Sequence, residues 1–347
     1  MAPTALVAGA TGAAARRLVE LLLARGWSVL AVTRRPPAPA ERLGHVAADL
    51  SDASRAALAA CGAVTHVFYA GRAAHGEGGV ESVADNVAML RNLLDGVLPV
   101  ARGLEHVHLV QGTKYYGLHL GRFPTPARED DPRHMPPNFY YDQQDLLVER
   151  RQGRRWTWSA SRPPVICDFA PDRARNLVPL IGAYAAIAAE LGVPLDFPGR
   201  PGCWEALTEL VDAGHLARAM AFLATDPRGA DRAFNVTNGD LLRWKRVWPR
   251  IAAACGVPPG EVRTLTLADW MKDKDAVWQR VVARHGLRPS RLSDIANWAF
   301  GDFVWRQDHD VVSSTTRLRL AGFAEVVDSE AMLLDQLARY RAAKILP

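Results

Sequence analysis

Two residues in the middle of the chain, Lys114 and Tyr140, carry the side chains required by a reaction that builds negative charge on an oxygen. A tyrosine hydroxyl can donate a hydrogen bond to such an oxygen, and a nearby ammonium group favours charge at the phenol. In enzymes that use such a pair, the lysine commonly follows the tyrosine by four positions. The only Tyr-x-x-x-Lys match in this sequence is Tyr340 to Lys344, three residues from the C-terminus. Chance accounts best for that match, because it lies far beyond the predicted sheet.

Lys114 and Tyr140 come from segments that a parallel sheet would bring together. Lys114 follows a predicted strand at residues 106–110, and Tyr140 stands near the start of a predicted helix at residues 138–151. Ligands bind at the carboxyl ends of parallel strands, so the phenol and the ammonium group can converge there. The competing interpretations are a solvated loop lysine and a tyrosine that caps a helix face. Candidates for lining a substrate pocket are Phe139, Tyr141 and Trp204.

The elements that must position these residues begin with a strand–turn–helix–strand unit near the N-terminus. An apolar strand at residues 5–8 breaks at Gly9-Ala-Thr-Gly12, and a helix with leucines at helical spacing ends at Gly26. Gly9 permits the tight turn, and Gly12 lets the backbone approach a pyrophosphate over the helix N-terminus. The third small position of the motif is Ala15. The unit predicts a dinucleotide site that includes Thr11 and Ala13; a strand–turn–helix without a ligand is the alternative.

The next strand, residues 28–33, ends in Arg34 and Arg35. Enzymes that use NAD place an acidic residue there for the ribose 2′-hydroxyl, whereas a guanidinium group suits a 2′-phosphate. The sequence therefore favours NADP(H) over NAD(H).

Further strands are predicted at residues 45–49 and 65–70, and helices alternate with strands through the first half of the chain. This alternation predicts an α/β fold with a Rossmann-type, doubly wound parallel sheet. Asp49 is expected either to meet the adenine of the dinucleotide or to cap a loop. The other expected cofactor contacts are Leu50, Tyr69, Ala70, Gln111, Pro163, Val165 and Ile166, besides Lys114 and Tyr140.

The second half of the chain is predicted to be a smaller, mostly helical substrate-binding part. We place the boundary near residue 170, which gives an NADP-binding domain at residues 1–170 and a substrate-binding part at residues 171–347. Segments at about 208–240 are expected to return and complete the sheet. Most of the ten tryptophans are expected to pack in the core.

Composition excludes several other classes of protein. The 347 residues are 49% hydrophobic and carry a net charge of +5. The sequence contains no run of basic residues of the kind that binds nucleic acid. No run is long enough to span a membrane, and the opening apolar segment is interpreted as a strand, not as a signal peptide. The expected location is therefore the cytoplasm. The four cysteines are widely separated, form no metal-type spacing and are expected to be reduced thiols.

Several longer motifs carry a resemblance to a known family. They are GATG at Gly9, VTRRP at Val32, THVFYA at Thr65, NVAMLRNLLDGV at Asn86, GTKYYG at Gly112, NFYYDQQD at Asn138, TWSASRP at Thr157, FNVTNGDLLRWK at Phe234 and FGD at Phe300. With these motifs, the sequence resembles the progesterone 5β-reductase/iridoid synthase-like (PRISE) family of extended short-chain dehydrogenases/reductases. The resemblance runs through nearly the whole chain.

The resemblance implies that Lys114 and Tyr140 take the places of the family's catalytic lysine and tyrosine. It also implies an enzyme that uses NADPH to reduce the carbon–carbon double bond of enones or enals. The expected partner is a small enone or carbonyl compound, and a homodimer is the expected assembly if the chain oligomerises through helices.

The sequence departs from the family pattern around the expected pocket. Arg72 replaces a common aromatic residue, Gln-Gly-Thr precedes Lys114, and the loop before Tyr140 is shorter. Two alternatives therefore stay open. One is a non-catalytic NADP(H)-binding regulatory protein of the same fold. The other is a short-chain dehydrogenase/reductase that interconverts carbonyls and alcohols or epimerises a sugar.

Overall fold

A computed structural model describes residues 2–52, 55–74 and 81–347. The chain divides into two compact units. The first consists of residues 1–164, 213–236 and 314–325, and the second of residues 165–212, 237–313 and 326–347. The first segment of unit 1 thus ends a few residues before the boundary expected near residue 170, and the chain returns to this unit at residue 213.

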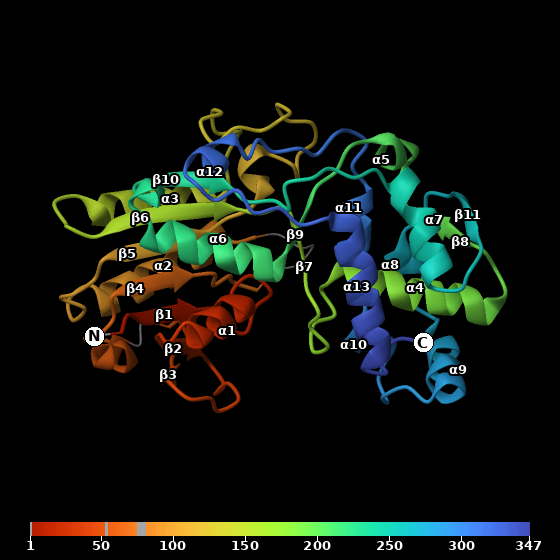
Figure 1. Cartoon of the computed structure of the whole chain (residues 1–347), viewed down its shortest axis with the longest axis horizontal. Helices are drawn as coiled ribbons and strands as arrows, with labels where there is room; N and C mark the ends of the chain where they lie inside the picture. The colour runs from red at the N-terminus through yellow and green to blue at the C-terminus, as the bar shows by residue number, and fades with distance from the viewer. Residues whose placement is uncertain (1, 53–54, 75–80) are drawn as a thin grey trace. The chain divides into compact units, whose positions relative to one another are not determined.

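Unit 1 is built on a seven-stranded sheet with the strand order β10-β6-β5-β4-β1-β2-β3, in which every neighbouring pair is parallel (Figure 1). Its strands are β1 Thr4–Ala8, β2 Ser28–Thr33, β3 Leu43–Ala47, β4 His66–Tyr69, β5 His106–Val110, β6 Thr157–Arg162 and β10 Arg232–Asn235. Its helices are α1 Arg16–Ala24, η1 Arg55–Ala60, α2 Val83–Val97, η3 Thr113–Tyr116, α3 Phe139–Arg151, α6 Ala213–Thr225, η4 Pro227–Gly229 and α12 Thr316–Leu320. The Rossmann-type sheet predicted from the alternating pattern is confirmed.

Helices cover both faces of this sheet. Leucines of α2 and α3, among them Leu93 and Leu147, pack with Val107 and Ala160 in one apolar core. Helices α1 and α6 contact each other and lie on the other face, where α6 packs on β5 and β6 (Figure 1). The layers on either side bury both faces of the central strands, as a parallel sheet requires.

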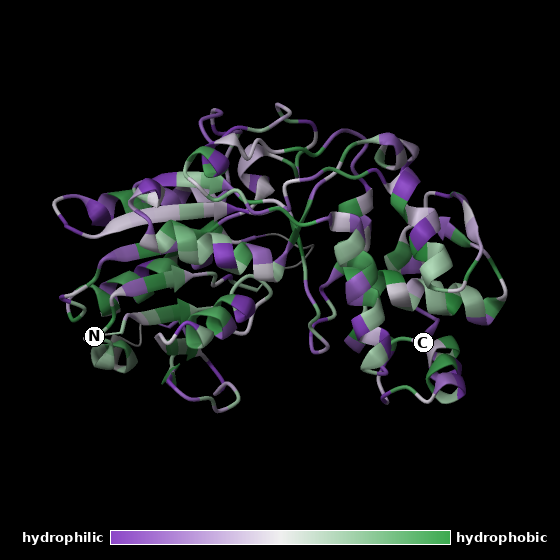
Figure 2. Cartoon of the chain, viewed as in Figure 1, coloured by the Kyte–Doolittle hydropathy of each residue, from purple (hydrophilic) through white to green (hydrophobic). Residues whose placement is uncertain are grey.

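Strand β6 is buried although its sequence, TWSASR, is largely polar, and Figure 2 draws it in paler shades than the greener strand β1. On the α6 face, its polar side chains pair with two buried histidines of β5. The contacts run in order through Thr157, His106, Ser159, His108 and Ser161, with lengths of 2.8, 2.7, 2.7 and 3.0 Å. We call these five residues the histidine–serine ladder.

Unit 2 is mostly helical, as predicted, with two pairs of short parallel strands, β7–β9 and β8–β11. Its strands are β7 Val165–Cys167, β8 Leu195–Phe197, β9 Leu210–Asp212 and β11 Pro259–Val262. Its helices are α4 Leu177–Leu191, α5 Pro201–Glu205, α7 Trp244–Ala254, α8 Leu267–Trp270, α9 Asp275–His285, α10 Leu292–Ile295, α11 Trp298–Trp305 and α13 Ser329–Ala342. Fully buried tryptophans, including Trp244, Trp248 and Trp305, pack around Phe197 in its core.

Candidate active site

The carboxyl ends of β1, β4, β5 and β6 meet at one edge of the unit 1 sheet, because the strands are parallel neighbours. Many of the residues expected to bind cofactor or substrate lie at the ends of these strands or of β2 and β3, and three more lie in the first turn of α3. Val165 and Ile166 in β7 and Trp204 in α5 belong instead to unit 2. There, the ring of Trp204 lies 5.1 Å from that of Phe197.

The glycine turn after β1 lies against the end of β4. Gly9 has a φ of +76°, and a Cβ at this position would come within 2.7 Å of the Ala70 carbonyl oxygen. Glycine is therefore required both by the left-handed backbone and by the close approach of the two strand ends. The Gly12 N–H donates to the Gly9 carbonyl at 2.8 Å, and α1 begins at Arg16, so Thr11 and Ala13 lie in the turn itself.

The two arginines after β2 are exposed, and the charge of Arg34 helps to lower the pKa of Asp49. The larger cause of that lowered pKa is Ser51, whose backbone N–H and hydroxyl donate to the Asp49 carboxylate at 3.0 and 2.6 Å. Asp49 therefore caps the turn after β3, as the loop-cap interpretation predicts. Next to it, the buried Leu50 accepts a hydrogen bond from Asn92 through its carbonyl oxygen.

Lys114 and Tyr140 are joined through a single side chain, that of Asn138. Its amide nitrogen donates to the Lys114 carbonyl oxygen at 2.8 Å, and its amide oxygen accepts from the Tyr140 N–H at 3.1 Å. Asn138 is the N-cap of α3, and asparagine is favoured there because its side chain satisfies a free N–H of the first turn. The fold thus brings the two predicted catalytic residues into one hydrogen-bonded unit, although the asparagine lies 24 positions after the lysine.

The Tyr140 hydroxyl lies directly over the backbone that leads to Lys114. A Cβ built on Gly112 would be 3.3 Å from this hydroxyl and 3.5 Å from the Pro163 carbonyl oxygen. Glycine at position 112 therefore leaves room for the phenol at the carboxyl end of β5 and β6. Tyr140 is 9% exposed, so its ring is largely held by protein.

The Lys114 ammonium group has a carboxylate partner that the sequence reasoning missed. Its Nζ lies 3.1 Å from Glu81, and Glu81 also contacts Arg72. The Arg72 guanidinium is 5.9 Å from the centre of the Phe139 ring, which in turn lies 4.3 Å from the Tyr140 ring. Arg72, the departure from the family pattern, is thus part of the charged surroundings of the site.

Three other residues expected at the site have side chains that form hydrogen bonds within the protein or are buried in its core. The Tyr141 hydroxyl donates to the Tyr115 carbonyl and accepts from the His134 N–H, so it braces η3. The Gln111 amide donates to the Tyr140 carbonyl oxygen at 3.1 Å. The Tyr69 side chain is fully buried in the core beside α2, and burial raises the pKa of its phenol.

Comparisons with known structures show the same fold. The chain resembles an Agrobacterium tumefaciens short-chain dehydrogenase/reductase superfamily protein with bound NAD, at a TM-score of 0.68 and 17% identity over 98% of this chain and 97% of that one. It also resembles the Thermus thermophilus UDP-glucose 4-epimerase complex with NAD, at a TM-score of 0.66 and 19% identity over 98% and 99%. Together with the sequence relatives described next, this fold makes the protein an oxidoreductase of the short-chain dehydrogenase/reductase superfamily.

The family follows from sequence comparison. The profile of the PRISE-like Rossmann-fold domain matches residues 42–347. The chain is 32% identical to the short chain dehydrogenase gsfE of Penicillium aethiopicum over 100% of both proteins. It is 34% identical to (S)-8-oxocitronellyl enol synthase ISY2 of Nepeta racemosa, over 99% of this chain and 91% of that one. It is likewise 34% identical to 3-oxo-Delta(4,5)-steroid 5-beta-reductase of Arabidopsis thaliana, over 99% and 93%. The chain belongs to the PRISE-like family, which confirms the resemblance.

In the described part of the chain, no helix combines the length and apolar character needed to cross a membrane.

Proposed function

We propose that this protein is an NADPH-dependent reductase of activated carbon–carbon double bonds, acting on an enone or enal. The observation that carries the proposal is the Asn138 bridge, which holds Lys114 and Tyr140 together at the carboxyl edge of the sheet. Two relatives, named as a 3-oxo-Delta(4,5)-steroid 5-beta-reductase and an (S)-8-oxocitronellyl enol synthase, support the same class of reaction.

The residues at this edge suit a dinucleotide. At Gly9, the turn and the end of β4 approach so closely that a Cβ would fill the space between them. Exposed guanidinium groups at Arg34 and Arg35 suit a 2′-phosphate, and no carboxylate takes their place after β2. When bound, NADPH supplies the hydride that is transferred to the β-carbon of the substrate.

Tyr140 acts on the substrate oxygen. As the β-carbon accepts the hydride, negative charge builds on the carbonyl oxygen, and the Tyr140 hydroxyl donates a hydrogen bond to it. This bond strengthens in the transition state and so accelerates the reaction. Lys114 orients the nicotinamide ribose and favours charge at the phenol, while Glu81 holds its ammonium group at 3.1 Å. Solvent then protonates the α-carbon.

The proposal is tested with NADPH and a small enone such as cyclohexenone. We expect the wild-type protein to consume NADPH above background. Tyr140→Phe should lower kcat by about 10²–10³-fold, because one oxyanion donor is lost, while NADPH binding, followed by fluorescence, persists. An unchanged rate would show that the phenol is assigned wrongly. NADPH binding by the wild type without turnover of any enone or carbonyl compound would favour a regulatory protein instead.

The choice of cofactor has its own test. Arg34→Ala should weaken NADPH binding by about tenfold or more and leave NADH binding nearly unchanged, because only NADPH carries the 2′-phosphate. Equal losses for the two cofactors would contradict the assignment.

A further inference from the structure

A fully buried arginine lies at the end of β6, behind the two proposed catalytic residues. Arg162 is 1% exposed. Its guanidinium donates to the Gln111 side chain at 2.9 Å, to the Tyr116 hydroxyl at 3.0 Å, to the Glu129 carbonyl oxygen at 3.1 Å and to the Gln144 side chain at 3.2 Å. We call Arg162 and these four partners the Arg162 cluster.

One side of the cluster holds the turn that carries Lys114. The Arg162 guanidinium lies 3.3 Å from the centre of the Tyr115 ring, a cation–π contact, and it also bonds Tyr116. Both tyrosines belong to η3, directly after Lys114. The Tyr116 hydroxyl donates in turn to Asn235 on β10 at 2.6 Å, which ties η3 to a second strand.

The other side holds the helix that carries Tyr140. Gln144 is one turn further along α3 from Tyr140. The Gln111 amide accepts from Arg162 through its oxygen and donates through its nitrogen to the Tyr140 carbonyl oxygen and to Gln144. A single guanidinium therefore fixes η3 and the first turns of α3 relative to β6.

Stability alone does not explain a charge at this place. The Arg162 guanidinium donates its hydrogen bonds to neutral acceptors, and the buried Glu129 carboxylate, whose charge also acts on it, pairs directly with Arg317 at 3.6 Å. Burying a charge without a direct ion pair costs free energy that an apolar side chain would avoid. What the planar, five-donor guanidinium offers is simultaneous, directional bonding to several segments.

We infer that Arg162 is a positioning residue of the active site, which sets Lys114 and Tyr140 in the geometry that hydride transfer requires. The inference rests on the proposed reductase function. It assigns Arg162 no contact with substrate or cofactor: the residue acts through Gln111, Gln144 and the tyrosines of η3.

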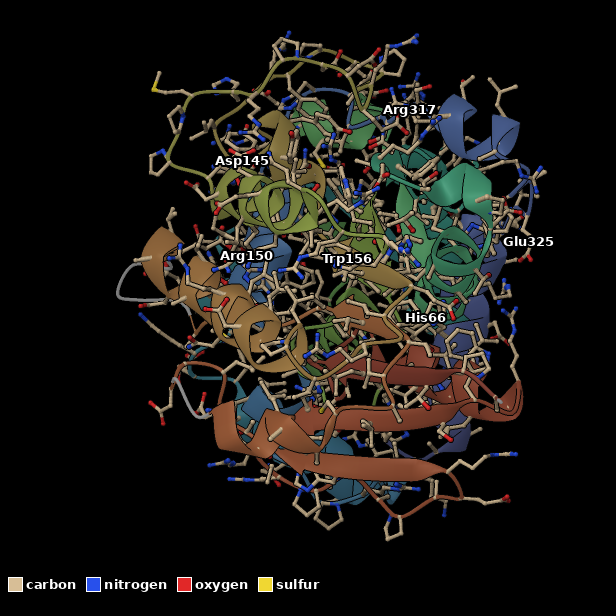
Figure 3. The ribbon with its side chains drawn as sticks, turned by 90° about the vertical axis from the view of Figure 1, so that its left-hand side faces the viewer. His66, Asp145, Arg150, Trp156, Arg317 and Glu325 are labelled. Atoms are coloured by element: carbon tan, nitrogen blue, oxygen red, sulfur yellow. The ribbon has the colours of Figure 1, made fainter. Side chains whose placement is uncertain are left out.

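The test compares wild type, Arg162→Ala, Arg162→Lys and a control, Arg150→Ala, in the NADPH and cyclohexenone assay. Arg150 is also an arginine bonded between segments, but it pairs with Asp95 of α2 and belongs to the last turn of α3, as Figure 3 labels it. We expect kcat to fall by about 10²-fold in both Arg162 variants, because small misplacements of reacting groups cost this much. The affinity for NADPH should change less than threefold, and Arg150→Ala should keep kcat within about twofold of wild type.

Added guanidinium ion, at millimolar concentrations far below those that denature proteins, should restore part of the kcat of Arg162→Ala but not of Tyr140→Phe. A purely structural role would lower stability without this rescue. If Arg162→Ala does not fold, Arg162→Lys is the variant to be measured, because it keeps the aliphatic part of the side chain and the positive charge. Folded Arg162 variants with wild-type kcat would overturn the inference.

Hydrogen exchange separates this inference from the proposed function. Amide exchange at residues 113–116 and 139–142 should rise in the Arg162 variants and not in Arg150→Ala, whether or not the wild type reduces enones. Unchanged exchange in both segments would overturn the inference even if the reductase activity is present. Raised exchange in a protein that reduces no enone would overturn only the proposed function.

Discussion

Strand β6 buries polar side chains on both of its faces, with partners on or just after β5, and the two sets differ in charge and in what they connect. On the α6 face, the histidine–serine ladder links the two strands only to each other. On the opposite face and at the carboxyl end, the Arg162 cluster reaches η3, α3 and the loop at Glu129. In Figure 3, His66 marks the α6 side of the sheet, and Arg150 marks the side of α2 and α3.

The charge states of the two sets follow from their surroundings. Burial is the main cause that lowers the pKa of His108 to about 3 and the pKa of His106 well below its usual value. The histidines of the ladder are therefore neutral at pH 7. The comparison shows that the buried polar side chains of the ladder join two strands of the sheet, whereas those of the Arg162 cluster hold the segments that carry the proposed catalytic residues.

The largest expected effect is the loss of unfolding free energy that the histidine–serine ladder causes as the pH falls. Above pH 6.5, both histidines are neutral in the folded and the unfolded state, so their contribution to stability is complete. Below pH 6.5, the unfolded chain binds protons that the folded chain does not, and the free energy of unfolding falls until the folded pKa, about 3 for His108, is reached. Each histidine contributes a slope of about 1.4 kcal/mol per pH unit in this window.

Denaturant titrations between pH 7 and pH 4.5 measure this slope. His108→Gln removes one titrating group and should flatten the slope by the share of one histidine, while kcat at pH 7 changes little. An identical slope in wild type and variant would show that His108 is protonated in the folded protein.

The next effect concerns the link between the two proposed catalytic residues. Asn138→Ala removes both the α3 cap and the bond to the Lys114 carbonyl oxygen. We expect a loss of about 1 kcal/mol in unfolding free energy and a fall of about tenfold in kcat. The matched control is Asn176→Ala, which removes the cap of α4 in unit 2. If both variants lose stability but neither loses rate, the Asn138 link does not position the site.

The smallest effect is a steric one at the phenol. Gly112→Ala places a methyl group 3.3 Å from the Tyr140 hydroxyl, so the phenol must move by a few tenths of an ångström. Gly112 has an extended backbone, with φ of 178°, so the change adds no backbone strain. We expect kcat to fall by about threefold to tenfold with little change in melting temperature. Gly103→Ala, where no atom lies within 4 Å of the new Cβ, serves as the control and should match wild type.

The sequence predicted the sheet and the family well, because both depend on local signals. Strands β2 and β5 have the expected bounds, since apolar runs with glycine or charged residues beside them mark both. The expected strand at residues 45–49 lies two residues earlier, as Leu43–Ala47. The segment expected to return to the sheet from about residue 208 does so only from Ala213, because residues 210–212 form β9 beside β7 in unit 2.

The residues that hold the site together were harder to predict. Arg162 and Gln111 are 51 positions apart, and Lys114 and Glu81 belong to different loops. Only pairing of the strands brings such partners together, and no motif spans them. The ladder had a visible signal, alternating polar residues at positions 106 and 108 and at 157, 159 and 161, but alternation alone predicts a solvent-facing side and not a buried one. Asn138 had the clearest signal, as an N-cap before a helical run.

The most direct test of the central claim follows the hydride itself. NADPH carrying deuterium at C4 of the nicotinamide is incubated with the wild-type protein and cyclohexenone, and the product is analysed by NMR. The proposed chemistry predicts cyclohexanone with deuterium at the β-carbon. Deuterium on the carbinol carbon of cyclohexenol would contradict it and would identify a carbonyl reductase instead.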